Sequence, residues 1–348
     1  MGQLSLFSPQ PAETSAGGAA PLDSRPAGPN GSGSARQAPA ALALCVLGSG
    51  SGGNSSVLNM PALAGRSGPA AKHAVLIDAG FGPWTIRRRL KQAGIEIDRV
   101  AAICLTHLDR DHWRPNWTNT LLEHGIRVFI HQWHMPGFEK LPEAEALLDG
   151  GLVEPFSESF EPLPGLSVSP IPLPHDQKGT VGYHIEAASS PATAEWEGRG
   201  AVARVGYATD LGAVPPELIE RFSAHGGVDL LAIESNYDPH LQAGSARPAF
   251  LKRRIMGELG HLSNEQAFEA VGRIAERCDP GTPRHIVLLH RSAQCNTPAI
   301  IRGVFGRDPS IGPRVTLTEQ RRRSAWFHLW ARPAVAAHQP SLFAARRG

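Results

Sequence analysis

The sequence Thr106-His107-Leu108-Asp109-Arg110-Asp111-His112 places four side chains that can bind metal within six consecutive positions. It directly follows residues 100–105, an apolar run typical of a buried strand. In α/β folds the loops at the carboxyl ends of strands carry ligands, so we expect these side chains to share one site. Residues 115–123 look helical, and Asp111 and His112 are therefore expected to point into that site from a helix amino terminus. A metal site explains the stretch better than a solvated polar loop does.

The composition is that of a globular protein without membrane or disulfide chemistry. The 348 residues, 41% of them hydrophobic, suffice for one large α/β domain or two ordinary ones. No apolar stretch approaches a membrane span and the amino terminus lacks a signal pattern, so we expect a cytoplasmic protein. The scattered Cys45, Cys104, Cys278 and Cys295 indicate buried thiols in a reducing compartment. Because the net charge is only +2, any nucleic-acid affinity must come from a local patch.

Three regions are expected along the chain. Residues 9–39 consist mainly of Gly, Ala, Pro and Ser and cannot bury enough apolar surface to offset the entropy of ordering. We therefore predict a disordered tail over residues 1–40, a folded hydrolase domain over residues 41–330 and a second tail over residues 331–348.

A glycine-rich stretch over residues 48–56 follows the first predicted strand, residues 42–47, and formally contains the G-x-G-x-x-G pattern. A dinucleotide-binding loop must open a helix, whereas residues 56–59 read as a returning strand, so we do not expect a nicotinamide cofactor. We predict a tight turn whose backbone N–H groups can face a phosphate, although a plain hairpin without a ligand remains the alternative. The candidate nucleic-acid contacts here are Ser49, Ser51 and Asn54.

Further acidic and histidine side chains also follow predicted strands. Residues 74–77, 167–172, 201–208, 229–233 and 286–289 have strand character and lead to Asp78, His175, Asp210, Glu234 and His290. One such histidine is usually structural, whereas several at strand ends indicate a shared site. Asp210 by itself would also suit the N-cap of a helix around residues 215–222.

Two predicted helices carry further candidates. Ser263 suits the N-cap of an amphipathic helix over residues 265–278, which places His261 on the loop just before it. The helix over residues 85–93 carries Arg87, Arg88 and Arg89, which we expect to form a solvated face. His131 and His134 are expected to be structural or surface residues.

These residues together resemble a known family. The metal stretch resembles the His-x-His-x-Asp-His signature of the metallo-β-lactamase fold, with Asp109 in place of the second histidine. With residues 48–56, the blocks Glu234-Ser235-Asn236 and Gly260-His261-Leu262-Ser263-Asn264 make residues 42–301 similar to the YycJ/WalJ-like branch, a bacterial group associated with exonuclease activity on DNA. The resemblance implies an αββα sandwich, in which two mixed sheets pack face to face with helices outside.

The resemblance also implies roles for the candidate residues. The first of two divalent ions would be held by His107, Asp109 and His175, the second by Asp111, His112 and His290, with Asp210 bridging them and Asp78 holding the metal loop from behind. Asp109 supplies a hard oxygen, which favours manganese over zinc and makes metal identity the main open question. The candidate catalytic residues are His261 as proton donor, Glu234 as its partner, and Asp111. Lys252, Arg253 and Arg254 would hold the nucleic-acid backbone, or else form a solvated helix face.

The residues and the resemblance together predict a metal-dependent phosphodiesterase, specifically a DNA exonuclease. The resemblance implies that it acts in the 5′ to 3′ direction. A ribonuclease would use the same residues. A hydrolase of small esters or lactones would not need Glu234, His261 or the basic run, and a non-catalytic binding module could have lost its metal through Asp109.

Each predicted tail carries a short apolar sequence. Gln3-Leu4-Ser5-Leu6-Phe7 resembles the pentapeptide by which bacterial replication and repair proteins dock on the DNA polymerase sliding clamp. A looser copy, Gln339-Pro340-Ser341-Leu342-Phe343, lies near the other end. We predict clamp binding in which the Leu-Phe pair of each copy fills an apolar pocket while Gln3 or Gln339 bonds at its rim. Otherwise, these are apolar patches that attach the tails to the domain.

Overall fold

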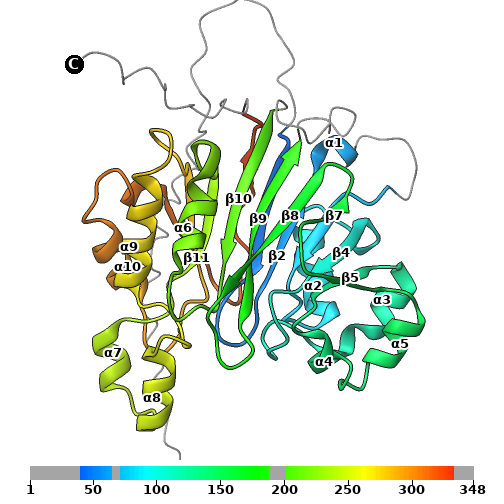
Figure 1. Ribbon diagram of the computed structural model, residues 1–348, viewed down its shortest axis with the longest axis horizontal. Helices are drawn as coiled ribbons and strands as arrows, with labels where there is room; N and C mark the ends of the chain where they lie inside the picture. Colours follow the sequence, from blue (N-terminus) through cyan, green and yellow to red (C-terminus); the bar gives the residue numbers. More distant parts are fainter. Residues whose placement is uncertain (1–39, 65–70, 189–200, 333–348) are drawn as a thin grey trace, which may run out of the picture. The chain divides into compact units, whose positions relative to one another are not determined.

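The structure is a computed structural model that describes residues 40–64, 71–188 and 201–332 (Figure 1). Nearly all of the tail predicted over residues 1–40, most of that over residues 331–348, and both clamp-like sequences lie outside the described residues. Among the described helices, none combines the length and the apolar character needed to cross a membrane.

Two sheets of seven strands each form the centre of the folded region. The first sheet has the order β14-β1-β2-β3-β4-β5-β6, where β3 to β6 run parallel and the rest antiparallel. Its strands are β1 (Leu42–Gly48), β2 (Ser55–Asn59), β3 (Ala74–Ile77), β4 (Val100–Cys104), β5 (Arg127–His131), β6 (Val153–Phe156) and β14 (Phe327–Leu329).

The second sheet has the order β13-β12-β11-β10-β9-β8-β7, where β10 to β13 run parallel and β7 to β10 antiparallel. Its strands are β7 (Phe160–Leu163), β8 (Leu166–Leu173), β9 (Thr180–Ala188), β10 (Val202–Ala208), β11 (Leu230–Glu234), β12 (His285–Leu289) and β13 (Val315–Leu317).

Helices cover the outer faces of both sheets (Figure 1). The main ones on the first sheet are α2 (Pro83–Gln92), α3 (Thr118–His124), α4 (Met135–Phe138) and α5 (Ala144–Asp149), whose apolar side chains pack with those of β1 to β5. The second sheet is covered by α6 (Pro216–Ser223), α9 (Asn264–Ala275) and α10 (Pro298–Phe305). A third apolar cluster fills the space between the sheets. The predicted αββα sandwich is thereby confirmed.

Strand β1 shows why these strands read as continuous apolar runs. Leu42, Leu44 and Val46 belong to the cluster between the sheets, while Cys45 and Leu47 belong to the cluster under the helices. A strand that is covered on both faces buries every side chain, so its sequence does not alternate between apolar and polar residues. All seven residues of β1 are buried.

Two local predictions are wrong. Asp111 and His112 do not sit at a helix amino terminus: they lie in a turn, Trp113 then pairs with Ala79, and α3 begins only at Thr118. Arg89 is buried and does not belong to a solvated face, because its guanidinium donates to the Leu47 carbonyl at 2.8 Å.

The N-cap prediction for the long helix is confirmed. Ser263 caps α9 in a capping box with Gln266. This cap fixes the backbone two residues after His261. The N-cap of α6 is Pro215, which leaves Asp210 free of that role.

The site lies where parallel strands of both sheets end. Asp78 follows β3, Asp210 lies two residues after β10, and His290 follows β12. These three residues adopt left-handed backbone conformations, with φ of 62°, 53° and 51°. Such conformations are costly for residues other than glycine and persist where the surrounding structure imposes them, often at functional sites. The strain therefore marks the edge where the two sheets meet.

Candidate metal centre

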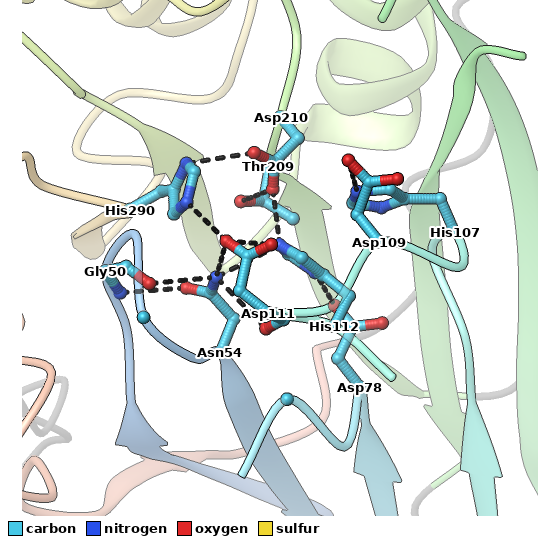
Figure 2. A network of polar contacts seen from close by, with 12 residues as sticks. Gly50, Asn54, Asp78, His107, Asp109, Asp111, His112, Thr209, Asp210 and His290 are labelled. Carbon is cyan, nitrogen blue, oxygen red and sulfur yellow. Dashed lines mark hydrogen bonds and ion pairs between the residues drawn. The ribbon is translucent and has the colours of Figure 1, made fainter. Parts of the chain in front are cut away.

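The metal-binding stretch is fixed from behind by one buried carboxylate. Asp78 accepts hydrogen bonds from the backbone N–H of Thr106 at 2.8 Å and from the Thr106 hydroxyl. Its other oxygen lies 2.8 Å from Nδ1 of His112 (Figure 2). The side chain of Asp78 is fully buried, so these bonds also compensate the cost of removing its charge from water. This is the position that the family resemblance implied for Asp78.

Three histidines are held by Nδ1 and turn Nε2 inward. Nδ1 of His107 lies 3.0 Å from the Thr106 hydroxyl and 3.2 Å from the Thr180 hydroxyl. Nδ1 of His175 is 3.0 Å from the Gly260 carbonyl, and Nδ1 of His112 faces Asp78. Outer partners of this kind fix the tautomer and ring orientation of metal-binding histidines.

Seven predicted metal ligands converge in overlapping groups. The ligand atoms of His107, His175 and Asp210 lie within 4.8 Å of one another, as do those of Asp111, His112 and His290. Asp210 reaches both groups, because its Oδ2 lies 2.7 Å from Nε2 of His112 and its Oδ1 lies 2.9 Å from Nδ1 of His290. Asp210 thus lies between the groups, where the family resemblance placed a bridging carboxylate (Figure 2).

Asp109, the seventh, differs from the other six in its surroundings. About half of its side chain is exposed, and its carboxylate lies 4.0 Å from Nε2 of His107. It forms a separate group with His175 and Asp176. Asp109 therefore stands at the rim of the centre, whereas the six other residues line its interior.

The charges of the centre suit a cation. Burial alone would raise the pKa of Asp210, but His290 and His112 outweigh burial and hold that pKa well below its ordinary value. Burial would conversely lower the pKa of His112 and His290, yet the carboxylates around them raise both pKa values well above normal. Carboxylates that attract protons to imidazoles this strongly also attract divalent cations, which displace those protons. The mixed imidazole and carboxylate donors fit zinc or manganese.

Glu234 supports two histidines at once. Its Oε1 lies 2.8 Å from Nδ1 of His261 and 2.9 Å from Nδ1 of His290, and its Oε2 accepts the backbone N–H of Leu211. Burial would lower the pKa of His261, but Glu234 outweighs burial and raises it. His261 keeps one fifth of its side chain exposed, while Glu234 is fully buried. The expected pairing of Glu234 with His261 is present, and His290 shares it.

The predicted glycine turn braces the centre. Ser49 and Asn54 are buried: the Ser49 hydroxyl donates to Asn54 Oδ1 at 2.8 Å and accepts the backbone N–H of His290 at 2.7 Å. Nδ2 of Asn54 lies 3.0 Å from Nε2 of His112. These two side chains therefore face the metal loop and not a phosphate outside. Of the three predicted contacts in this turn, Ser51 is the exposed one and lines a cavity.

Two cavities flank the centre. One of about 370 Å³ lies over Asp111, Asp210, His261 and His290. Another of about 810 Å³ adjoins His107 and His175 and reaches the end of α8 (Ala249–Met256). The two cavities share Asp109, His175, Asp176 and Arg254 in their walls, and together they are large enough for a nucleotide-sized ligand beside the metal groups.

The predicted basic run on α8 faces these cavities in part. Arg253 lines the larger cavity and Arg254 lines both. Arg254 makes a two-point ion pair with Asp176, and Lys252 donates to the Ala243 carbonyl at 2.7 Å. Asp176 was missed from the sequence, although it follows His175 directly after a predicted strand.

His131 and His134 are buried, as expected for structural residues, and His134 reaches the wall of the larger cavity. Neither joins a potential metal-binding group in the described part of the chain.

A family model described as the beta-lactamase superfamily domain matches residues 73–290. The chain belongs to the beta-lactamase superfamily. A curated relative, exodeoxyribonuclease YycJ from Bacillus anthracis, is 25% identical over 237 residues, which cover 66% of this chain and 78% of the relative. The resemblance to the YycJ-like branch is thereby confirmed, and the protein is a hydrolase.

Solved structures share the superfamily fold across most of the chain. A diphosphatase from the PhnP family covers 83% of this chain and 98% of its own, with a TM-score of 0.51 and 16% identity. Zinc-bound PqqB from Methylobacterium extorquens covers 81% of this chain and 99% of its own, with a TM-score of 0.52 and 17% identity. At identities this low, the likeness to these two structures shows a shared fold only.

The tight contact of Gly80 with the metal loop gives a first prediction. A Cβ atom at Gly80 would lie 1.7 Å from the backbone oxygen of Asp111, so Gly80→Ala must displace the loop. We expect the variant to lose most bound divalent metal and about 1–3 kcal/mol of unfolding free energy. Metal content and urea unfolding measure the two effects. Gly272→Ala is the control, because nothing lies within 4 Å of a Cβ there. Wild-type metal content in Gly80→Ala would contradict the prediction.

Proposed function

We propose that this hydrolase is a metal-dependent phosphodiesterase that degrades nucleic acid, and specifically an exonuclease that acts on DNA in the 5′ to 3′ direction. The observation that carries the proposal is the meeting of two ligand groups at Asp210 beside a carboxylate-backed histidine, His261. Hydrolysis of a phosphodiester needs both charge stabilisation at phosphorus and a proton for the leaving oxygen. The relative described as an exodeoxyribonuclease supports DNA as the substrate.

The residues of the centre fit two divalent ions, manganese or zinc. His107, His175 and Asp210 would hold one ion, and Asp111, His112 and His290 the other, with Asp210 shared. Asp109 would join the first group from the rim. Ions bound there would activate water and stabilise negative charge on the phosphate oxygens. Asp78 and the glycine turn keep the histidines oriented, so the protein contributes a preformed ligand geometry.

His261 is placed to donate a proton. Glu234 holds Nδ1 of His261, which leaves Nε2 as the group available to a ligand in the cavity over Asp111 and His290. A histidine that is oriented and charged by a buried carboxylate is suited to protonate a leaving oxygen. Arg254 lines the same cavity and would bind the phosphate backbone near it.

Other functions are less well supported by this site. A hydrolase of small esters or lactones would not need Glu234, His261 or the arginines beside the cavities. A ribonuclease would use every feature described, so RNA is the second candidate substrate. A non-catalytic binding module that lost metal through Asp109 would not need the six interior ligand residues.

The proposal predicts that Asp111→Ala and His112→Ala each reduce nucleic-acid hydrolysis by about a thousandfold or more, since ligands of one centre act as a unit. End-labelled single- and double-stranded DNA and RNA, tested with manganese, magnesium and zinc, give the rates and the direction of cleavage. His328→Ala, an exposed histidine on β14, serves as the control. Hydrolysis at the wild-type rate in either ligand variant would refute the metal mechanism. Faster hydrolysis of RNA than of DNA would change the assigned substrate from DNA to RNA.

The proton-donor role predicts a dependence on the leaving group. We expect His261→Ala to lower turnover of an oligonucleotide by about 10²–10⁴-fold while bound metal stays at the wild-type level. A nitrophenyl phosphodiester, whose leaving group needs no proton, should lose far less. The loss of turnover on the oligonucleotide, divided by the loss on the nitrophenyl phosphodiester, measures how much His261 contributes as a proton donor. Equal losses on both substrates, or loss of metal, would assign His261 a different task.

We also propose that the protein docks on the DNA polymerase sliding clamp through the sequences at residues 3–7 and 339–343, which lie outside the described residues. Two copies on one chain could engage equivalent pockets of a ring with avidity. A titration of purified clamp with wild type, Leu6→Ala/Phe7→Ala, Leu342→Ala/Phe343→Ala and the combined variant tests this. Each pair should weaken binding and the combination should abolish it. Undiminished binding by the combined variant would disprove the docking.

A further inference from the structure

A run of three arginines, Arg321, Arg322 and Arg323, is fastened to the glycine turn beside the metal centre. The backbone N–H of Gly52 donates to the Gln320 side chain at 3.0 Å, and that of Ser49 donates to the Glu319 carbonyl at 3.1 Å. A Cβ atom at Gly52 would lie 2.4 Å from the end of the Gln320 side chain, which shows how closely the two segments approach. The arginine run is therefore held at a fixed place next to the turn, although it lies far from it in sequence.

The first two arginines of the run face solvent. Arg321 and Arg322 are exposed, and neither forms an ion pair among the described residues, where other arginines make such pairs. Arg114 adds a third charge at the turn, because its guanidinium donates to the carbonyls of Gly52 and Gly80 at 3.1 and 2.8 Å. Glu319 is the acidic side chain within this segment and does not balance three arginines.

The positive surface continues along helix α2. Arg323 donates to the carbonyl of Gln92 at 2.6 Å, which places the end of the run at the carboxyl end of α2. Trp84, Arg88 and Lys91 are exposed at positions i, i+4 and i+7 of this helix and so share one face. Trp84 is 70% exposed, and the Arg88 guanidinium lies 4.9 Å from the centre of its ring. The exposed indole and the cations of this helix therefore lie on one face, where both are accessible to a ligand.

This surface begins at the active-site cavity. Ser51, at the tip of the glycine turn, lines the cavity over Asp111 and His290, and Gly52 next to it carries the contacts to Gln320 and Arg114. Figure 2 shows Gly50 and Asn54 of the same turn directly beside Asp111 and His290. A polymer that leaves the cavity over Ser51 therefore meets the arginines next. The basic residues of α8 border the cavities elsewhere, at Arg253 and Arg254.

We propose that this turn-side surface binds the backbone and bases of a single nucleic-acid strand beyond the scissile phosphate. It comprises Trp84, Arg88, Lys91, Arg114, Arg321 and Arg322. Guanidinium and ammonium groups bind phosphates along a strand, and an exposed indole offers a face on which a base stacks without sequence preference. An acidic protein would use the cations and leave the indole without a role. The inference rests on the proposed function and extends it, since it makes the protein prefer long single strands to short ones.

Equilibrium binding tests the surface directly. A fluorescent single-stranded DNA of about 20 nucleotides is titrated with wild type, Arg321→Ala/Arg322→Ala and Trp84→Ala, with chelator present so that the strand stays intact. For the double variant we expect about tenfold weaker binding at low salt. The slope of log binding constant against log salt concentration should be shallower by about 1.4, which is about 0.7 for each phosphate that the variant no longer neutralises. Trp84→Ala should weaken binding several-fold and leave the salt dependence unchanged, because stacking releases no counterions.

The matched control is Arg273→Ala/Arg277→Ala, which removes the same charge from two exposed arginines at the end of α9. It should bind as wild type does. Equal affinities and salt slopes in the two double variants would overturn the surface. If polyglutamate competes as well as DNA does and Trp84→Ala has no effect, the surface is a general polyanion site and the nucleic-acid assignment falls.

Hydrolysis separates this inference from the proposed function. For an active wild type, the rise in KM of Arg321→Ala/Arg322→Ala should be larger for a long strand than for a dinucleotide, which cannot reach the turn-side surface. Failure of wild type to hydrolyse either substrate would refute the phosphodiesterase, while the titration would still decide whether the surface binds DNA.

Discussion

The contact between Asp210 and His112, at 2.7 Å, joins the two sheets at the edge where the chemistry is located. Asp210 comes from the second sheet after β10, and His112 from the loop that follows β4 of the first. Both side chains are buried, so the charge of the carboxylate must be balanced locally or its burial would destabilise the fold. His290 and His112 supply that balance. The two halves of the sandwich are thus linked by the group that would also bridge two cations.

Around this contact, the protein holds its histidines through second partners. Asp78, the Gly260 carbonyl and Glu234 each fix the Nδ1 side of a ring that turns its other nitrogen inward. This arrangement has a cost, since Asp78 and Asp210 adopt left-handed conformations that are unfavourable for aspartate. The apolar clusters between and outside the sheets stabilise the strands well enough to impose that strain. A rigid core therefore supports a site that could not be stable alone.

The surroundings of the centre differ on its two sides. On one side, α8 presents Arg253 and Arg254 to the cavities, and an ion pair to Asp176 holds Arg254 in place. On the other, the glycine turn is hydrogen-bonded to Gln320, which precedes Arg321 and Arg322. If the proposed phosphodiesterase function holds, basic residues on both sides of the centre suit a substrate longer than the site itself. A small ester would fill the cavity and gain nothing from either side.

The sequence alone determined most of the strands, because runs covered on both faces are continuously apolar and end at polar turns. It also predicted a metal-binding stretch, since His107, Asp111 and His112 stand together after one such strand, and the structure brings these side chains into one cluster. The resemblance to the family added His175, Asp210 and His290. These residues needed no structure to be named, because ligand types and strand ends are local features of the chain.

Only the tertiary structure decided which partners the polar side chains contact. Arg89 looked solvated, but the packing of α2 against β1 buries it on the Leu47 carbonyl. Ser49 and Asn54 looked like phosphate contacts, yet the fold turns them onto the backbone of His290 and the ring of His112. The placement of Arg321 beside the glycine turn joins segments that are far apart in sequence. Local pattern reports which face of an element is apolar, whereas the partners of polar side chains depend on which distant elements pack together.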